Sequence, residues 1–353
     1  MKMFLPVTKF LPSILLKRSR LLPSPGRVVA RKGQKVNAND IIAEANLTPQ
    51  HLMLDLSKGL GIPVKKLDKY LERHVGDRVS EGDVIAGPVG LTHRIVRAPA
   101  PGQVVLINSG QVLLELDSPP FELRAGLPGV VAELIPERGA LIESSGTLIQ
   151  GIWGNGQINS GLVRSLLDRP ENVLTSDRMD VSFRGAVVIS GYCEDEAVLE
   201  HAADLPLRGL VLSSLASKLV PLAAELQFPV LVVEGFGLLP WNSVAFNLLS
   251  GLDQTEVAIN AETWDPVNNQ RPELLILEPS TSSATEPEGW TELTVGQHVR
   301  VIASSNHGRV GIVSQAYPRL EIFPSGMKAQ SVKVSFENGN TAMVPVANLE
   351  ALD

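Results

Sequence analysis

Three apolar runs in the middle of the sequence end in side chains that could bind a small molecule. Each run is continuous, as in strands that are buried on both faces of a parallel sheet, and ligands of such sheets gather at the carboxyl ends of the strands. The candidate ligand-binding residues at these ends are Ser190, Gly191, Ser213, Ser214, Glu234, Gly235, Phe236 and Gly237. The simpler interpretation of the last four residues is a tight turn with a core phenylalanine.

The sequence offers no arrangement that is typical of an active site. Cys193 has no histidine near it in the sequence, and no serine stands in a glycine-framed turn. The single cysteine excludes a disulfide framework and a multi-cysteine metal site, and the 6 histidines do not fall at metal-ligand spacing. We therefore predict no catalytic, cofactor-binding or metal-binding residue and no cofactor, and we favour a non-enzymatic protein over an enzyme.

Positive charge is concentrated at the N-terminus. Residues 1–39 hold nine basic residues and no acidic one, although the net charge of the chain is −7. Residues 1–24 are therefore expected to form a basic arm that can engage RNA phosphates. The alternative is that the arm meets the acidic surface of its own body or of a partner subunit. The residues assigned to contact with RNA or another partner are Lys17, Arg18, Arg20, Arg300, His307 and Arg309.

Residues 25–150 repeat short phrases that are typical of small β structures. A Gly-x-x-Val phrase followed by an Asp-hydrophobic-Ile-Ala run occurs twice, beginning at Gly33 and at Gly76. Pro-Gly followed by a strand-forming run begins at Pro25, Pro101 and Pro128. Glycine permits the tight turns between such short Val- and Ile-rich strands. The repetition predicts two interlocked halves of one small β structure.

The second copy of these phrases carries a resemblance to a known family. Residues 74–86, followed by Ala98-Pro99-Ala100-Pro101-Gly102-Gln103-Val104, resemble the biotinyl/lipoyl domain, a barrel-sandwich hybrid. In that family a hairpin between the two parts carries the modified lysine, and this chain has Leu91 there. The resemblance therefore implies that residues 25–150 form one barrel-sandwich hybrid without a biotin or lipoyl group. A helical insertion is expected at 48–72, with Thr48 as its N-cap and Gly59 at its C-terminal end.

From residue 181 onward, strand-like and helix-like stretches alternate. This alternation predicts that residues 181–279 form a parallel α/β sheet covered by helices. Residues 151–180, which are rich in glycine at their start, are interpreted as a connecting β segment. The Ser-, Thr- and Pro-rich stretch 280–290 is typical of a linker at a domain boundary.

Residues 291–353 resemble the KOW module, a small SH3-like barrel. The resemblance depends on the glycine-spaced strands at 295–301 and 308–313 and on a hairpin signal at Asn338-Gly339. KOW barrels of ribosomal proteins and transcription elongation factors bind RNA or protein. Because basic and acidic residues balance in 291–353, contact with protein is favoured over contact with RNA. We expect this region to fold independently of the rest.

In domain order the chain resembles uncharacterised bacterial proteins that combine a lysine-less barrel-sandwich region, an α/β segment and a terminal KOW barrel. The expected fold class is multidomain, β-rich plus α/β. We favour a cytoplasmic scaffold or adaptor that binds protein or ribonucleoprotein partners. Two alternatives stay open: an RNA-, ribosome- or transcription-associated factor, and a small-molecule sensor or enzyme. No apolar run reaches the about 18–20 residues of a membrane span, and the sequence leaves the oligomeric state open.

Overall fold

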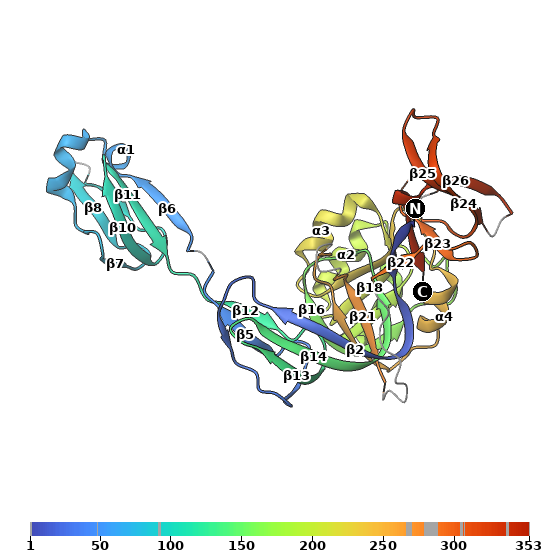
Figure 1. The fold of residues 1–353 in the computed structure, drawn as a ribbon. Helices are drawn as coiled ribbons and strands as arrows, with labels where there is room; N and C mark the ends of the chain where they lie inside the picture. The colour runs from blue at the N-terminus through green and yellow to red at the C-terminus, as the bar shows by residue number, and fades with distance from the viewer. Residues whose placement is uncertain are drawn as a thin grey trace.

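The computed structural model describes residues 2–47, 49–90, 93–265, 270–278, 289–303, 306, 308–336 and 339–352. Strands dominate and form several sheets, as predicted for a β-rich chain. The molecule is elongated: a small β module projects from one end of a larger body, and the C-terminal strands lie at the other end (Figure 1). No helix in the described ranges is long and apolar enough to cross a membrane.

Seven strands form a β module at the base of the projection, which we call the outer module. They are β2 (Phe10–Leu21), β3 (Arg27–Val28), β4 (Lys35–Val36), β5 (Ile41–Ala45), β12 (Phe121–Arg124), β13 (Gly129–Ile135) and β14 (Gly139–Gln150). Small and branched side chains, among them Ala43, Ala125 and Ile142, fill its core. β14 pairs with β2 and, from Gly146 onward, also with β21 (Glu273–Leu277) of the body. The outer module is therefore continuous with the body.

The projecting unit, which we call the inserted module, spans residues 49–117 between β5 and β12. Its elements are β6 (His51–Asp55), α1 (Leu56–Leu60), the 3-10 helix η1 (Val64–Tyr70), β7 (Arg78–Val79), β8 (Val84–Val89), β9 (Arg94–Arg97), β10 (Gly102–Asn108) and β11 (Gln111–Leu116). Leu56, Leu60 and Leu67 pack in a core of its own. The Leu116 N–H donates to the Gln50 carbonyl oxygen at 2.8 Å, which closes the base of the module.

The two modules share one framework of backbone hydrogen bonds. Three N–H to carbonyl hydrogen bonds of the outer module each have an equivalent in the inserted module. Gly33 donates to Val131 as Gly76 donates to Val104 (2.8 and 2.7 Å), and Val131 donates to Gln34 as Val104 donates to Asp77 (both 2.9 Å). Ala125 likewise donates to Asp40 as Ala98 donates to Asp83 (2.9 and 2.8 Å). A β-bulge also follows Val131 in β13 and Val104 in β10. The prediction of two interlocked halves is therefore wrong: each set of phrases builds a complete module, and one module is inserted into the other.

The helical insertion is shorter than the range 48–72 that the sequence predicts. Residues 51–55 form strand β6, and Thr48 lies outside the described residues. Helix α1 begins after Asp55, whose side chain accepts a hydrogen bond from the Lys58 N–H. It ends at Gly61, which has φ +69°, whereas the expected C-terminal residue Gly59 lies inside the helix. The apolar residues at 52–60, whose spacing predicts one helix, thus lie partly in strand β6 and partly in α1, which is a single helical turn.

The body contains a large sheet with the strand order β15-β19-β18-β17-β16-β20-β21-β14-β13-β4. Its further strands are β15 (Trp153–Gly154), β16 (Ile158–Ser165), β17 (Ala186–Ser190), β18 (Gly209–Leu215), β19 (Val230–Phe236) and β20 (Glu256–Asn260). Strands β17 to β19 are parallel, as predicted, and β16, which lies before the predicted α/β range, joins them in parallel. The prediction of a parallel sheet is wrong for β20 and β21, which are antiparallel. Residues 151–180 are not a mere connection, because β16 lies in the middle of this sheet.

Helices cover both faces of the parallel strands. They are α2 (Glu196–Asp204), α3 (Val220–Glu225) and α4 (Ser243–Leu249), with short 3-10 turns η2 (Ser176–Arg178), η3 (Val181–Phe183) and η4 (Ser217–Leu219). α2 and α3 pack with Val188 and Leu210 on one face. α4 packs with Val187 and Val211 on the other. Alternate residues of each strand therefore face different helices, which explains the uninterrupted apolar runs.

The C-terminal sheet has the order β22-β1-β27-β23-β24-β25-β26. Its elements are β1 (Phe4–Thr8), β22 (Trp290–Glu292), β23 (His298–Val301), β24 (Val310–Ile322), β25 (Lys328–Phe336), β26 (Thr341–Pro345), the 3-10 turn η5 (Val346–Asn348) and β27 (Leu349–Leu352). β1 pairs with β22 and with β27, and its Leu5 and Val7 are buried in the core of this sheet.

These pairings contradict two predictions about the ends of the chain. Residues 1–24 do not form a free arm, because β1 and β2 are paired strands. Residues 291–353 do not form a self-contained unit, because a strand from the N-terminus lies between β22 and β27. Most of the predicted linker 280–290 lies outside the described residues, as does Leu91.

Candidate functional site

The chain itself fills the strand ends that the sequence singles out. The Ser213 and Ser214 hydroxyl groups donate to the Leu239 carbonyl oxygen at 3.0 and 2.8 Å, and the Leu239 N–H donates to Ser214 Oγ at 3.1 Å. Gly308 packs against the side chain of Leu239, since a Cβ on Gly308 would lie 2.4 Å from Leu239 Cδ2. Both serines therefore hold a loop and are buried.

The neighbouring candidates Ser190 and Gly191 are closed in the same way. Trp241 Nε1 donates to the Ser190 carbonyl oxygen at 3.0 Å. A Cβ on Gly191 would lie 1.8 Å from the Asn172 carbonyl oxygen, so glycine is needed for two backbone segments to touch. At the third strand end, Gly235 and Gly237 have positive φ angles, and Phe236 makes an edge contact with Trp153 at 6.3 Å between ring centroids. These contacts match the simpler interpretation of a tight turn with a packed phenylalanine.

Glu234 takes part in a buried network of charges. Arg300 Nη1 donates to Glu234 Oε2 at 2.6 Å, and Arg300 Nε donates to Glu350 Oε1 at 2.5 Å. The other oxygen of Glu350 accepts hydrogen bonds from Thr8 Oγ1 at 2.7 Å and from Arg271 Nη1 at 3.1 Å. The network joins the first strand, the parallel sheet and the C-terminal sheet at one point. It also joins two residues that the sequence assigns to different sites, Glu234 and Arg300.

The electrostatics of this network favour its charged form. Burial alone would raise the pKa of Glu350, but the charges of Arg300 and Arg271 outweigh it and hold this pKa below its ordinary value. Burial alone would lower the pKa of Arg300, but Glu350 and Glu234 raise it above its ordinary value. The charges of Glu350 and Arg300 therefore compensate each other, which is the requirement for a stable buried ion pair. At Arg271, by contrast, burial outweighs the attraction of Glu350 and lowers the pKa of the guanidinium below its ordinary value.

The predicted RNA contacts near the C-terminus have other roles. Arg300 is 1% exposed, so it cannot meet a phosphate at the surface. Arg309 lies over the Phe336 ring at 4.1 Å from its centroid and donates to Asn306 Oδ1 at 3.1 Å. His307 lies outside the described residues. The prediction that Arg300 contacts RNA is therefore wrong. Its burial could not be seen in the sequence, because its partners Glu234 and Glu350 are distant in sequence.

The basic residues of β2 line a cleft of about 1290 Å³ between the outer module and the large sheet. Arg18 makes three hydrogen bonds to the carboxylate of Glu273, at 2.6 to 3.1 Å. Arg20 forms a two-pronged ion pair with Glu262, and Lys17 lies 3.3 Å from a Glu143 carboxylate oxygen. The pKa of Glu262 is below its ordinary value, since hydrogen bonding and charge from Arg20 outweigh burial. Carboxylates of the same chain thus compensate these three cations. This agrees with the alternative prediction, in which the basic N-terminal segment meets the acidic surface of its own body.

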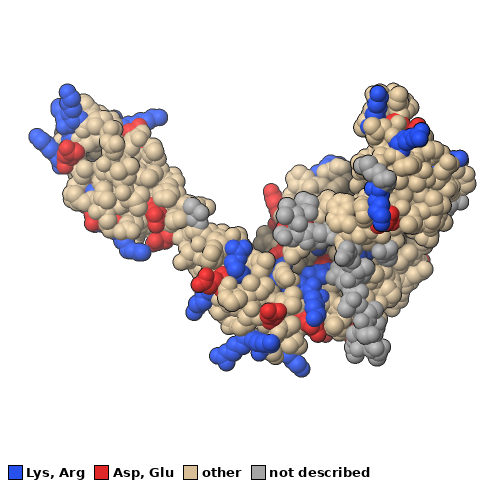
Figure 2. Space-filling view, in the orientation of Figure 1, with Lys and Arg blue, Asp and Glu red and all other residues tan. Residues whose placement is uncertain are grey.

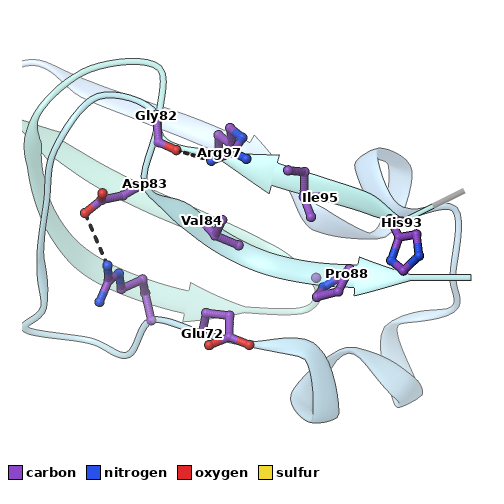
Figure 3. Close-up of a pocket in the computed structure, with 10 residues that line it drawn as sticks. Glu72, Gly82, Asp83, Val84, Pro88, His93, Ile95 and Arg97 are labelled. Carbon is purple, nitrogen blue, oxygen red and sulfur yellow. Dashed lines mark hydrogen bonds and ion pairs between the residues drawn. The ribbon is translucent and has the colours of Figure 1, made fainter.

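A second hollow of about 590 Å³ lies on the inserted module beside β8 and β9 (Figure 3). An Arg73 Nη donates to Asp83 Oδ2 at 3.2 Å, and Arg97 Nη1 donates to the Gly82 carbonyl oxygen at 2.6 Å. The outer module has an arginine contact at the position equivalent to Arg97, from Arg124 to Asn39 Oδ1 at 3.2 Å. Both arginines of the hollow therefore brace a turn, and we assign no ligand to it.

Two exposed apolar surfaces were not found by the sequence analysis. At the projecting tip of the β24–β25 hairpin, Leu320 is 63% and Ile322 70% exposed. On the inserted module, Met53, Leu113 and Leu106 are cross-strand neighbours in a row across β6, β11 and β10. In that row Met53 is 59% and Leu106 51% exposed. Alternation within single strands could have indicated these residues, but only the pairing register brings the row together.

The described residues contain no cluster of three or more His, Cys, Asp and Glu side chains that could hold a metal ion. Cys193 is buried, and burial raises the pKa of its thiol to about 12. A thiol with this pKa is a poor nucleophile at neutral pH. In comparisons with known proteins, neither a protein-family model nor a curated protein matches the chain.

Proposed function

We propose that this protein is a non-enzymatic scaffold or adaptor that binds protein or ribonucleoprotein partners through its β modules. The observation that carries the proposal is the pair of exposed apolar surfaces on the two projecting parts of the molecule (Figure 1). We call Leu320 and Ile322 the hairpin surface, and Met53, Leu113 and Leu106 the strand row. Apolar side chains grouped at the surface are typical of protein interfaces. Two such surfaces on opposite ends suit a protein that brings partners together.

The proposal includes the family resemblances of the two β regions. We assign a barrel-sandwich hybrid of the biotinyl/lipoyl type to the inserted module, which holds the whole stretch from His74 to Val104. We assign a KOW-type SH3-like barrel to the C-terminal sheet, with β1 as an added strand. The proposal places the protein in the cytoplasm, which suits a chain with one buried, unpaired cysteine.

The strand ends of the body favour a binding protein over a small-molecule enzyme. Most of the groups that would face a ligand there already have partners: the Ser213 and Ser214 hydroxyls bond to Leu239, the Ser190 carbonyl accepts from Trp241, and Glu234 pairs with Arg300. The Ser190 hydroxyl is the exception among them, since it is buried with no hydrogen-bond partner among the described residues. The cations of β2 likewise favour a protein partner over RNA at that position, because Arg18 and Arg20 are paired with carboxylates. A phosphate would have to displace these carboxylates before it could bind.

Quantitative affinity capture from the native lysate, with and without nuclease, tests the proposal. The variants are Leu320→Ser with Ile322→Ser, and Met53→Ser with Leu106→Ser. Each double variant is expected to lose its own set of partners, with affinities reduced about tenfold or more, because buried apolar anchors carry most of an interface's binding energy. Partners of the other surface should be retained.

The matched control replaces two exposed apolar residues outside both surfaces, Val181→Ser with Leu238→Ser, which are 81% and 70% exposed in the wild type. It should leave every captured partner unchanged. If the control lowers recovery as much as the two surface variants, or if no variant alters recovery, the scaffold proposal is wrong.

A further inference from the structure

The end of the inserted module that is farthest from the body carries a group of lysines. We call Lys58, Lys65, Lys66 and Lys69 the lysine patch; all four are exposed. They lie on α1 and η1, whose Leu56, Leu60 and Leu67 share the core of the module. The turn that follows α1 is held by Ser57, whose carbonyl accepts from the N–H groups of Gly61 and Ile62. Figure 2 shows positive side chains gathered at this end. The patch therefore stands on a fixed turn.

The lysine patch differs from the cations of β2 in its lack of acidic partners. Among the described residues, none of its four lysines lies within ion-pair distance of a carboxylate, whereas Lys17, Arg18 and Arg20 all do. The Arg94 guanidinium adds charge next to α1, since a Cβ on Gly61 would lie 2.3 Å from its Nη1. Asp55, Asp68 and Glu72 are the acidic residues on or beside α1 and η1. The five cations therefore outnumber the local carboxylates.

The position of the patch favours a large anionic partner. The whole chain carries a net charge of −7, so the remainder of the molecule is acidic and repels such a partner. The patch lies at the end of an elongated molecule, well away from the body in Figure 1. Charge interactions are screened over a Debye length of about 8 Å at physiological salt, so the acidic body has little influence at this end.

The chemistry of the patch selects among anionic partners. Lysine is depleted in protein interfaces, which place charge around an apolar centre, and this patch has only Val64 as an exposed large apolar side chain. One such side chain also gives a bilayer little to bury. Lysine point charges without exposed aromatic rings suit contacts to a phosphate backbone, which carry no sequence information.

We propose that the lysine patch binds the phosphate backbone of nucleic acid without sequence preference. This inference deepens the proposed scaffold function and rests on it, because it assigns the ribonucleoprotein partner to the far end of the inserted module. The hairpin surface and the strand row are then left for protein partners.

Salt-dependent binding of a 20-nucleotide poly(U) RNA, measured by fluorescence anisotropy with the full chain, tests the proposal. The wild-type protein is compared with the triple variant Lys65→Ser, Lys66→Ser and Lys69→Ser. Each phosphate contact on a single strand contributes roughly 0.7 to the slope of log affinity against log salt, so the triple variant should flatten this slope by about 2. These side chains are exposed, and thermal unfolding should be unchanged.

The matched control removes three exposed lysines elsewhere, with Lys32→Ser, Lys35→Ser and Lys328→Ser. It changes the net charge equally and should leave the slope within experimental error of the wild type. An equal effect of the two triple variants, or no RNA binding by the wild type, would overturn the proposal. So would lysine-dependent binding to phosphatidylserine vesicles or poly-L-glutamate that equals or exceeds binding to poly(U).

The two proposals can fail separately. The surface variants could lose protein partners while the lysine triple variant keeps the wild-type slope of log RNA affinity against log salt. That outcome refutes only the nucleic-acid assignment. A lysine-dependent RNA slope, together with unchanged protein capture in the surface variants, refutes only the assignment of the apolar surfaces to protein partners.

Discussion

The outer and inserted modules have the same backbone framework and different surroundings. In the outer module, β14 continues for 12 residues and joins the large sheet, and the arginines of β2 are paired with Glu262 and Glu273. In the inserted module, the equivalent strand β11 has 6 residues, the strand row is exposed, and the lysine patch has no acidic partner among the described residues. One module is built into the body, and in the other Met53, Leu106 and the lysine patch stay exposed.

The comparison separates two groups of residues in a repeated module: those that the module needs for folding, and those that lie on its outer surface. Both modules keep the same glycine turns and the same aspartates that accept backbone N–H groups at Asp40 and Asp83. They differ in residues on the outside of the sheet, where Ser19 in β2 takes the place of Met53 in β6. The framework therefore specifies the fold, and the outward-facing residues decide whether a surface is structural or available.

The largest expected effect on stability comes from removing the charge that joins the parts of the body. Arg300→Met leaves Glu234 and Glu350 buried without their shared cation, which should cost about 3–5 kcal/mol of unfolding free energy. Hydrogen exchange should show lost protection in β19, β23 and β27, while β10 and β11 of the inserted module stay protected. Such a result would demonstrate that the two regions have separate stability.

A matched substitution distinguishes the network from the general loss of an arginine. Arg309→Met removes a half-buried guanidinium that lies over the Phe336 ring, a contact that contributes about 0.5–1 kcal/mol. It should therefore have the smaller effect. Equal losses in the two variants, or loss of protection in the inserted module of the Arg300 variant, would contradict the comparison.

Acid should weaken the body through the same network. The pKa of Glu350 in the folded protein lies below its ordinary value of 4.5, so its contribution is present above that value and is lost as the pH falls through the folded pKa. Each pH unit between the unfolded and folded pKa is worth about 1.4 kcal/mol. The difference in unfolding free energy between the wild type and Glu350→Gln should therefore shrink between pH 6 and pH 3 in urea titrations. A difference that does not vary with pH would rule out this titration.

The elements of the body could be predicted because their signals are local. Uninterrupted apolar runs indicated β17, β18 and β19, and the Asp195 N-cap gives a local start signal for α2. The nesting of the two modules could not be found in this way, because the chain returns to β12 only after 75 residues of other structure between Ala45 and Phe121. Phrase repetition alone does not reveal which copies belong to the same module.

The sites were predicted less well than the elements, since charge and exposure depend on distant partners. The sequence pattern of β23 indicates a half-exposed strand, in which Arg300 would face solvent. In the structure Arg300 is buried against Glu234 of β19 and Glu350 of β27. Arg18 and Arg20 form part of a basic run in the sequence, yet their carboxylates come from residues more than 200 positions away. A lysine-rich turn such as Lys65-Lys66 is a better signal, because no long-range pairing is needed to leave it exposed.

An equivalent glycine substitution in each module should have an intermediate effect. A Cβ on Gly102 would lie 2.2 Å from the Glu115 carbonyl oxygen, and a Cβ on Gly129 would lie 2.2 Å from that of Glu143. Forcing a methyl group into such a space costs about 1–3 kcal/mol. Gly102→Ala should destabilise the inserted module alone, whereas Gly129→Ala should also loosen the large sheet through β14. Hydrogen exchange resolved by region checks this, and identical patterns in the two variants would refute the proposed independence of the inserted module.

The smallest effect on the body is expected from removing the inserted module altogether. Ala45 at the end of β5 and Phe121 at the start of β12 are directly opposite each other in an antiparallel pair. A two-residue Asn-Gly turn fits such a pair, so it can replace residues 46–120 without changing the register. Because the core of the inserted module contains none of the buried residues of the outer module, the shortened body should lose less than about 1 kcal/mol, within the range of surface changes.

The excised module gives the reciprocal measurement. Residues 49–117 contain a buried core and a closing hydrogen bond between Leu116 and Gln50, so this fragment should unfold cooperatively on heating. It should also retain the poly(U) binding of the full chain, since the lysine patch and Arg94 lie within it. Two results would contradict this expectation: a shortened body that unfolds at a much lower temperature, or a fragment without a cooperative transition. Either result would mean that each module depends on the other for its stability.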